Sequence, residues 1–196
     1  MFPVLLLVVL LAWPAGPVRQ NWPPLTEAER AGLRAMLDRL LLPVHVARLH
    51  ARPADAWLAM PVEGVRASQV TDTFGAPRPG GRRHQGQDIF ARRGTPVRAA
   101  TDGFVVRIGE DTLGGKVVSV MGAGGRVYYY AHLDEHAPGL RTGDRVRRGA
   151  LLGRVGTTGN ARGTPPHLHF GVYARGGAID PRPLLHAGAE IPRAVP

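Results

Sequence analysis

Residues 164–173 read Thr164-Pro165-Pro166-His167-Leu168-His169-Phe170-Gly171-Val172-Tyr173. Histidines alternate here with apolar residues, and side chains two positions apart lie on the same face of a β-strand. We therefore expect His167 and His169 to share one face of a strand, with Leu168, Phe170 and Val172 in a core. Two imidazoles on one face of a strand whose other face is apolar indicate a metal or catalytic site.

The composition around this stretch favours a turn-rich β protein. The chain has 196 residues, with 26 glycines and 18 prolines, which suits one β domain with an extension better than a helical bundle. The sequence has no cysteine. Disulfides and thiolate metal sites are therefore excluded, and a zinc ion would need His, Asp or Glu ligands.

The net charge of +10 favours anionic partners such as nucleic acid, lipid headgroups or acidic cell-wall polymers. The arginines are spread along the chain, which is equally compatible with a general preference for arginine over lysine. No basic stretch alternates with aromatic residues as it would in a nucleic-acid platform. We therefore expect no nucleic-acid partner.

The N-terminal segment indicates export. Val4 to Trp13 is almost purely aliphatic and is followed by Pro14-Ala15-Gly16-Pro17. This run is too short to span a bilayer as a helix but suits the apolar region of a signal peptide. We predict a signal peptide or an uncleaved N-terminal anchor in residues 1–16. Either predicts an exported protein of the periplasm or cell envelope, with membrane contact only through these residues if they are uncleaved.

Residues 17–59 are predicted to form a helical spacer or pro-segment. Thr26 and Glu29 match a capping box. Apolar residues then recur at three- and four-residue intervals, at Leu33, Met36, Leu37, Leu40 and Leu41. We expect a helix of about four turns that ends at or shortly before Pro43, and a second short helix within residues 44–58. This segment is a candidate contact for another protein of the cell envelope.

From Met60 onward the pattern predicts a mainly β domain over residues 60–186, followed by a loose tail at residues 187–196. Short apolar runs separated by glycine-rich turns are expected as strands at 70–75, 97–100, 103–109, 116–121, 126–133, 151–155 and 168–174. Many short strands with few helical signals predict a twisted antiparallel sheet, arranged as a sandwich or a barrel-like sheet.

Further candidate ligands lie outside the opening stretch. His84 and Asp88 are four residues apart, and catalytic zinc typically takes three protein ligands and a water molecule. One histidine of the 167/169 pair would complete such a set, and the spacing does not say which. His132 ends another predicted strand, on which strand alternation places it on one face with Tyr128 and Tyr130.

Four blocks of this sequence resemble the lysostaphin-type (LytM-like) zinc metallopeptidases, which cut peptidoglycan peptides. The resemblance runs from about Met60 to Leu185. The blocks, in the order of the family, are Val70-Thr71-Asp72-Thr73-Phe74-Gly75, then His84-x-Gly86-x-Asp88 with Gly94-Thr95-Pro96 and Asp102-Gly103, then Tyr130-Ala131-His132-Leu133, and lastly Val146-x-x-Gly149 through Thr158-Gly159 to Pro166-His167-Leu168-His169-Phe170.

The resemblance implies one zinc ion per chain, bound by His84, Asp88 and His169. It implies catalytic roles for His132 and His167, one as general base and the other stabilising the developing oxyanion or holding the water. Which residue takes which role stays open. The family's fold is a twisted antiparallel sheet with a narrow groove, and the loops at 76–83 and 156–166 are expected to wall it.

The resemblance therefore predicts an exported zinc endopeptidase that hydrolyses peptide bonds in murein stem peptides or cross-links. The alternative is a non-catalytic LytM-type regulator that activates a cell-wall amidase. That alternative predicts missing site residues, whereas all five are present. The sequence departs from the family at Gly171, where an acidic residue often follows the last block, and this puts fine substrate specificity in doubt.

Overall fold

The computed structural model describes residues 24–189. The predicted signal peptide or anchor at residues 1–16 lies outside the described residues, and so does most of the predicted tail. Contacts along the chain divide it after Ala31, so residues 24–31 are described by themselves and the fold below is that of residues 32–189.

Three α-helices occur in the described residues: α2 at Glu27–Leu40, α3 at Leu42–His50 and α4 at Arg182–Ala189. The predicted capping box at the start of α2 is confirmed, because Glu29 N–H donates to Thr26 Oγ1 and Thr26 N–H donates to a Glu29 carboxylate oxygen. Pro43 lies in the first turn of α3, where its missing N–H leaves no hydrogen bond unmade. Among residues 24–189, no helix combines the length and apolar character needed to cross a bilayer.

Helix α3 packs on the β domain. It lies against strand β3, Gly103–Asp111, and the short 3-10 turn η3, Ala123–Gly125, and Leu49 is its buried residue. His45 stacks on the ring of Phe104, with 4.5 Å between ring centroids. A side chain at Gly125 would overlap the His50 ring, so the helix approaches the turn closely. Just before α3, Arg39 pairs with Asp144 at 2.7 Å.

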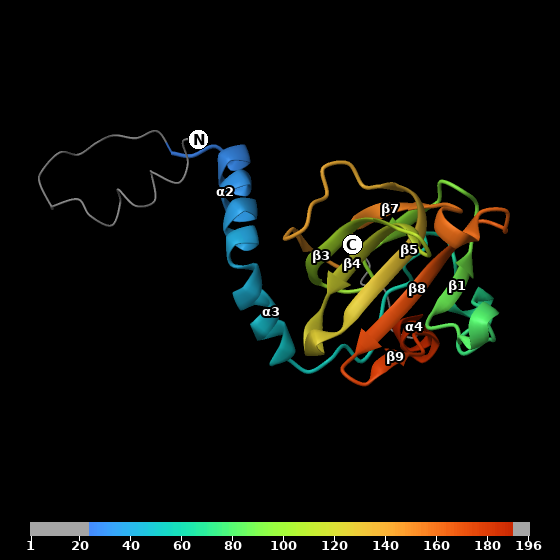
Figure 1. Ribbon diagram of the computed structural model, residues 1–196. Coiled ribbons are helices and arrows are strands. Elements are labelled where there is room, and N and C mark those ends of the chain that lie inside the picture. The colour runs from blue at the N-terminus through green and yellow to red at the C-terminus, as the bar shows by residue number, and fades with distance from the viewer. Residues whose placement is uncertain (1–23, 190–196) are drawn as a thin grey trace, which may run out of the picture. The chain divides into compact units, whose positions relative to one another are not determined.

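The predicted antiparallel sheet is confirmed. In the described part of the chain the strands are β1 Gln87–Phe90, β2 Pro96–Arg98, β3 Gly103–Asp111, β4 Gly115–Met121, β5 Val127–His136, β6 Arg145–Val146, β7 Leu151–Val155, β8 His167–Ala174 and β9 Gly177–Ile179. The main path is β1-β8-β5-β4-β3-β6, all antiparallel, and β7 joins β5 to β2. Strand β8 therefore lies between β1 and β5 (Figure 1).

Alternation along β8 follows the sequence prediction. Leu168, Phe170 and Val172 are fully buried in the main core, and the two histidines lie on the opposite face. The core also receives Leu58 from the segment before the predicted domain. Leu58 N–H donates to the Leu184 carbonyl at 2.9 Å, so residues just ahead of Met60 belong to the packed domain.

Two expectations about elements are wrong. Residues 70–75 form no strand, because Thr73 directs its hydrogen bonds to the side chain of Gln87 and to β1 instead of to a neighbouring strand. Helix α4 extends into the predicted tail as far as Ala189. The second short helix predicted within residues 44–58 is confirmed as α3, which begins slightly earlier, at Leu42, and ends at His50. The sequence pattern does not predict strands β1, β6 and β9, each of which has only two to four residues.

The predicted face of His132 is also wrong. The register of β5 shifts between Tyr130 and Leu133, where the strand leaves β8 and begins to pair with β7. His132 lies in this bulge with a φ of 62°, and no other non-glycine residue in the described chain has a positive φ. A bulge inserts one extra residue and reverses the alternation beyond it. Tyr130 and Leu133 are therefore both in the core, while His132 turns toward His167 and His169.

Candidate metal centre and active site

Three side chains bring one ligand atom each to a single point beside β8. His84 Nε2 lies 2.8 Å from His169 Nδ1 and 3.0 Å from Asp88 Oδ1, and His169 Nδ1 lies 3.2 Å from the same oxygen. Zinc bonds of about 2.0–2.1 Å in a tetrahedron place neighbouring ligand atoms about 3.3 Å apart. The spacing and the nitrogen and oxygen donors of this set therefore fit a zinc ion.

Thr73 fixes the orientation of two of these residues. Its carbonyl accepts the Nδ1–H of His84 at 2.7 Å, and its hydroxyl oxygen accepts the backbone N–H of Asp88 at 2.9 Å. A carbonyl can only accept, so the proton of His84 lies on Nδ1 and the lone pair on Nε2 faces the other ligand atoms. The buried side chain of Gln87 in turn accepts hydrogen bonds from the N–H and the hydroxyl of Thr73.

Arg78, in the predicted wall loop 76–83, donates to the outer oxygen of Asp88, Oδ2, at 2.6 Å. Burial alone would raise the pKa of the Asp88 carboxyl. Hydrogen bonds with His169, His84 and Arg78 outweigh burial and hold this pKa well below its usual range. The carboxyl group is therefore ionised, as a metal ligand must be.

Gly86 gives His169 its space. A Cβ at this position would lie 2.7 Å from the Phe170 carbonyl oxygen and 2.8 Å from the ring of His169. Gly86 is needed for room and not for a special backbone conformation, because its φ is not in the left-handed region. The glycine between His84 and Asp88 is thus part of the site.

The remaining two histidines, His132 and His167, lie beside the ligand set. Their ring centroids are 5.1 Å apart, and that of His132 is 5.9 Å from that of His169. Each ring donates its Nδ1–H to a carbonyl, His132 to Thr158 at 2.9 Å and His167 to Pro165 at 2.8 Å. Both carbonyls belong to the predicted wall loop 156–166. Since each ring carries its proton on Nδ1, the Nε2 atom of each ring keeps its lone pair.

Burial determines the charge of the His132 and His169 rings. It lowers the pKa of His132 to about 4, with the nearby His169 and His167 rings acting in the same direction. Burial also lowers the pKa of His169, against the opposing effect of Asp88. Both imidazoles are therefore neutral near pH 7, which is the form that binds metal or accepts a proton.

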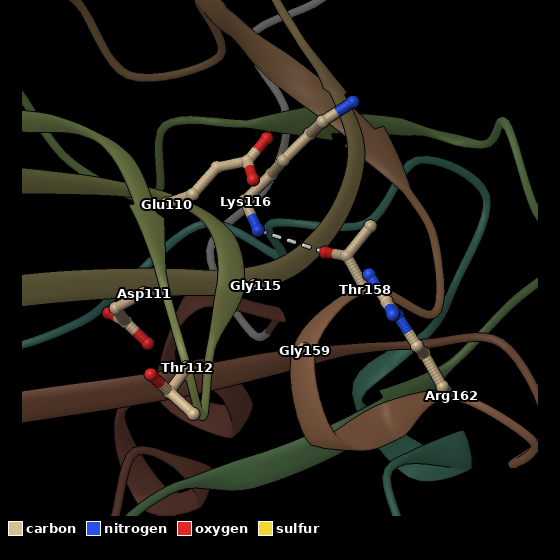
Figure 2. Close-up of a pocket in the computed structure, with 8 residues that line it drawn as sticks. All are labelled: Glu110, Asp111, Thr112, Gly115, Lys116, Thr158, Gly159 and Arg162. Carbon is tan, nitrogen blue, oxygen red and sulfur yellow. Dashed lines mark hydrogen bonds between the residues drawn. The ribbon is translucent and has the colours of Figure 1, made fainter.

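A cavity of about 400 Å³ is lined in part by Thr158 (Figure 2), whose carbonyl accepts the Nδ1–H of His132. Its lining residues come from the end of β3, the start of β4 and the 3-10 turn η4, and they are Glu110, Asp111, Thr112, Gly115, Lys116, Thr158, Gly159 and Arg162. The cavity carries charges of both signs. On the other side of the site, the half-exposed ring of Phe90 lies 5.3 Å from that of His167.

The structure brings together all five residues singled out in the sequence. Sequence reasoning missed Thr73, Arg78 and the carbonyls of Thr158 and Pro165. Thr73, Thr158 and Pro165 lie in or beside the quoted blocks, but each contacts a site histidine through its backbone carbonyl. Every residue type carries a backbone carbonyl, so residue identity does not predict these contacts. A Cβ at Gly171, where the sequence departs from the family, would lie 2.8 Å from the Tyr173 ring and 3.2 Å from the Gln85 carbonyl oxygen, so a larger residue there would displace that ring.

The model of a protein family described as peptidase family M23 matches residues 82–181, which contain all five histidine and aspartate residues of the site. The chain belongs to peptidase family M23.

Among curated relatives, this M23 chain is 39% identical over 118 residues to the L-Ala–D-Glu endopeptidase of Bacillus subtilis, covering 55% of the chain and 36% of the relative. It is 33% identical over 111 residues to the peptidoglycan DD-endopeptidase ShyC of Vibrio cholerae, covering 57% and 24% respectively. The chain thus spans about a third or less of the length of these relatives.

Among solved structures, the M23 chain is similar to the catalytic domain of the antimicrobial peptidase lysostaphin from Staphylococcus simulans. The TM-score is 0.54 at 31% identity, and the match covers 61% of this chain and 94% of the lysostaphin domain. The mostly antiparallel fold is therefore that of a lysostaphin catalytic domain, and its relatives include peptidoglycan endopeptidases.

Proposed function

We propose that the chain is an exported zinc endopeptidase that hydrolyses peptide bonds in murein stem peptides or cross-links. The observation that carries the proposal is the convergence of two kinds of group at one place. His84, Asp88 and His169 offer ligand atoms about 3 Å apart, and two further imidazoles lie next to them with free Nε2 atoms.

His84 Nε2, Asp88 Oδ1 and His169 Nδ1 would hold one zinc ion per chain. Bound there, zinc would polarise the scissile carbonyl and lower the pKa of a water molecule toward neutrality. Thr73 and Arg78 support this role, because they hold His84 and Asp88 in place through the atoms that do not face the ion.

His132 and His167 would move the protons of the reaction. A neutral ring can accept the proton of the attacking water at Nε2, and the resulting imidazolium can pass it to the leaving nitrogen. The second ring can hydrogen-bond to the developing oxyanion or hold the water. The Nδ1–H bonds to Thr158 and Pro165 leave Nε2 unprotonated in both neutral rings, and His167 Nε2 lies 3.8 Å from Asp88 Oδ1.

The names of the relatives support a murein substrate. They include an L-Ala–D-Glu endopeptidase and a peptidoglycan DD-endopeptidase, which differ in the bond they cut, so the bond stays unassigned here. The mixed charges of the cavity beside Thr158 suit a peptide that carries both carboxylate and ammonium groups. A non-catalytic regulator of an amidase would not need this complete set of site residues.

Export and the division of the chain remain proposals. Residues 1–16 would act as signal peptide or anchor, residues 17–59 as a spacer that can contact a cell-envelope partner, and residues 60–186 as the metallopeptidase domain. The burial of Leu58 favours a start of the folded domain a few residues earlier. We therefore propose tests on the whole chain.

The ligand assignment is tested by zinc content and murein hydrolysis of the purified chain. We expect about one zinc per chain, activity that is lost with a chelator and restored by zinc, and neither zinc nor activity in His169→Ala. His132→Ala should bind zinc but cleave poorly. Stoichiometric zinc in His169→Ala would refute its role as ligand, and full hydrolysis by His132→Ala would refute its catalytic role.

A further inference from the structure

The orientation of the His132 ring depends on Thr158. This residue immediately precedes η4, Gly159–Ala161, and its carbonyl accepts the Nδ1–H of His132 at 2.9 Å. Because the carbonyl cannot donate, this contact selects the tautomer with the proton on Nδ1. It also fixes the direction in which the Nε2 lone pair points.

The side chain of Thr158 holds that carbonyl in place. Its hydroxyl donates to the Leu133 carbonyl at 2.8 Å and accepts the backbone N–H of Lys116 at 2.9 Å. Figure 2 shows the second of these bonds on the wall of the cavity. One hydroxyl therefore ties the loop to the start of β4 and to the residue that follows His132 in β5.

The backbone of His132 needs this support. Its φ of 62° lies in the left-handed region, where a non-glycine residue is strained and persists only because the surrounding structure holds it there. The N–H of His132 donates to the Gly114 carbonyl at 2.7 Å. A side chain at Gly115 would overlap Thr158 and the backbone N of Gly159, so the β3–β4 turn approaches the loop closely at this point.

We propose that Thr158 is a positioning residue for His132, acting through its hydroxyl on the placement of its own carbonyl. The proposal rests on the proposed function of His132 in peptide hydrolysis. The hydrogen bonds of Thr158 in the described structure go to residues 116, 132 and 133, and none goes to the three candidate metal ligands. Loss of the hydroxyl should therefore lower turnover without lowering zinc content.

The test compares three variants of the whole zinc-loaded chain. Thr158→Val removes the hydroxyl, and Thr158→Ser keeps it. Thr101→Val is the matched control, since the Thr101 hydroxyl donates to the Asp55 carboxylate at 2.8 Å, outside the loop at 156–166. We expect kcat on murein peptides to fall by about 10-fold or more in Thr158→Val, with KM within about threefold. Thr158→Ser and Thr101→Val should stay within about threefold of the parent chain.

Imidazole ¹⁵N–¹H spectra provide a readout that does not depend on activity. The His132 Nδ1–H signal, assigned by its absence from His132→Asn, should be present in the parent chain, Thr158→Ser and Thr101→Val but weakened or lost in Thr158→Val. If the parent chain cleaves no murein peptide, the proposed function fails while these spectra still test the positioning. Parental kcat with an unchanged signal in Thr158→Val would overturn the proposal, and so would loss of zinc together with turnover.

Discussion

At the scale of single residues, the site depends on small groups around the ligands as much as on the ligands. Thr73 uses its carbonyl for His84 and its hydroxyl for Asp88, and Gly86 leaves space for the ring of His169. Such contacts set ring direction and tautomer, which decide whether a lone pair reaches the metal. Zinc affinity should therefore respond to changes at residues that never touch the ion.

Gly86→Ala should weaken zinc binding by roughly 10-fold or more, because the added methyl would displace the His169 ring or the Phe170 carbonyl. A competition titration against a chromophoric chelator measures the affinity. Gly176→Ala is the control, since a Cβ there meets nothing within 4 Å and its φ is not left-handed. Equal zinc affinity in Gly86→Ala and the parent chain would contradict the role given to this glycine.

The lowered pKa of His132 predicts a pH dependence of the free energy of unfolding. The ring binds a proton below about pH 6.5 in the unfolded chain but only below about pH 4 in the folded one. The unfolded state therefore binds more protons between these values, and the free energy of unfolding falls as the pH decreases through this window, by up to about 3 kcal/mol.

Urea unfolding of the metal-free chain between pH 7.5 and pH 4 measures this loss. His132→Asn removes the titrating ring while keeping a residue type that tolerates a positive φ. Its unfolding free energy should fall less steeply with acid than that of the parent chain. Parallel pH profiles would show that His132 is not the buried neutral group described here.

At the scale of elements, two neighbouring strands show what a sequence pattern can and cannot predict. In β8 the period of two is unbroken, so the faces of Leu168 and His169 follow from the sequence. In β5 the same rule fails at His132, because the strand changes its partner from β8 to β7 and takes up an extra residue there. That exchange depends on contacts distant in sequence, which no local pattern contains.

Helix α3 gives a prediction at the same scale. Leu49→Ala removes the buried side chain of this helix and should lower the free energy of unfolding by about 2–3 kcal/mol, while zinc content and murein cleavage are kept. Val44, which is exposed on the same helix, supplies the control, and Val44→Ala should change stability by less than about 0.5 kcal/mol. Denaturant unfolding measures both variants, and equal losses would contradict the packing of α3 described above.

At the scale of the whole molecule, the sheet brings to one place residues that lie far apart in the sequence. His84 and Asp88 come from the loop before β1 and from β1, His132 from β5, and His167 and His169 from β8. The order β1-β8-β5 makes these three strands neighbours. The sequence identified the five residues through their ordered blocks, but spacing alone left the choice between His167 and His169 open. The carbonyl groups that orient the histidines and the arginine that pairs with Asp88 could be identified only in the folded structure.

The central claim is that this arrangement hydrolyses murein peptides with zinc. Its most direct test is to digest purified murein with the zinc-loaded chain and to identify the released fragments by chromatography and mass spectrometry. We predict a new peptide end at one defined bond, which is absent after chelation and absent with His169→Ala. Intact murein after prolonged digestion with fully zinc-loaded protein, or the same cleavage by His169→Ala, would contradict the claim.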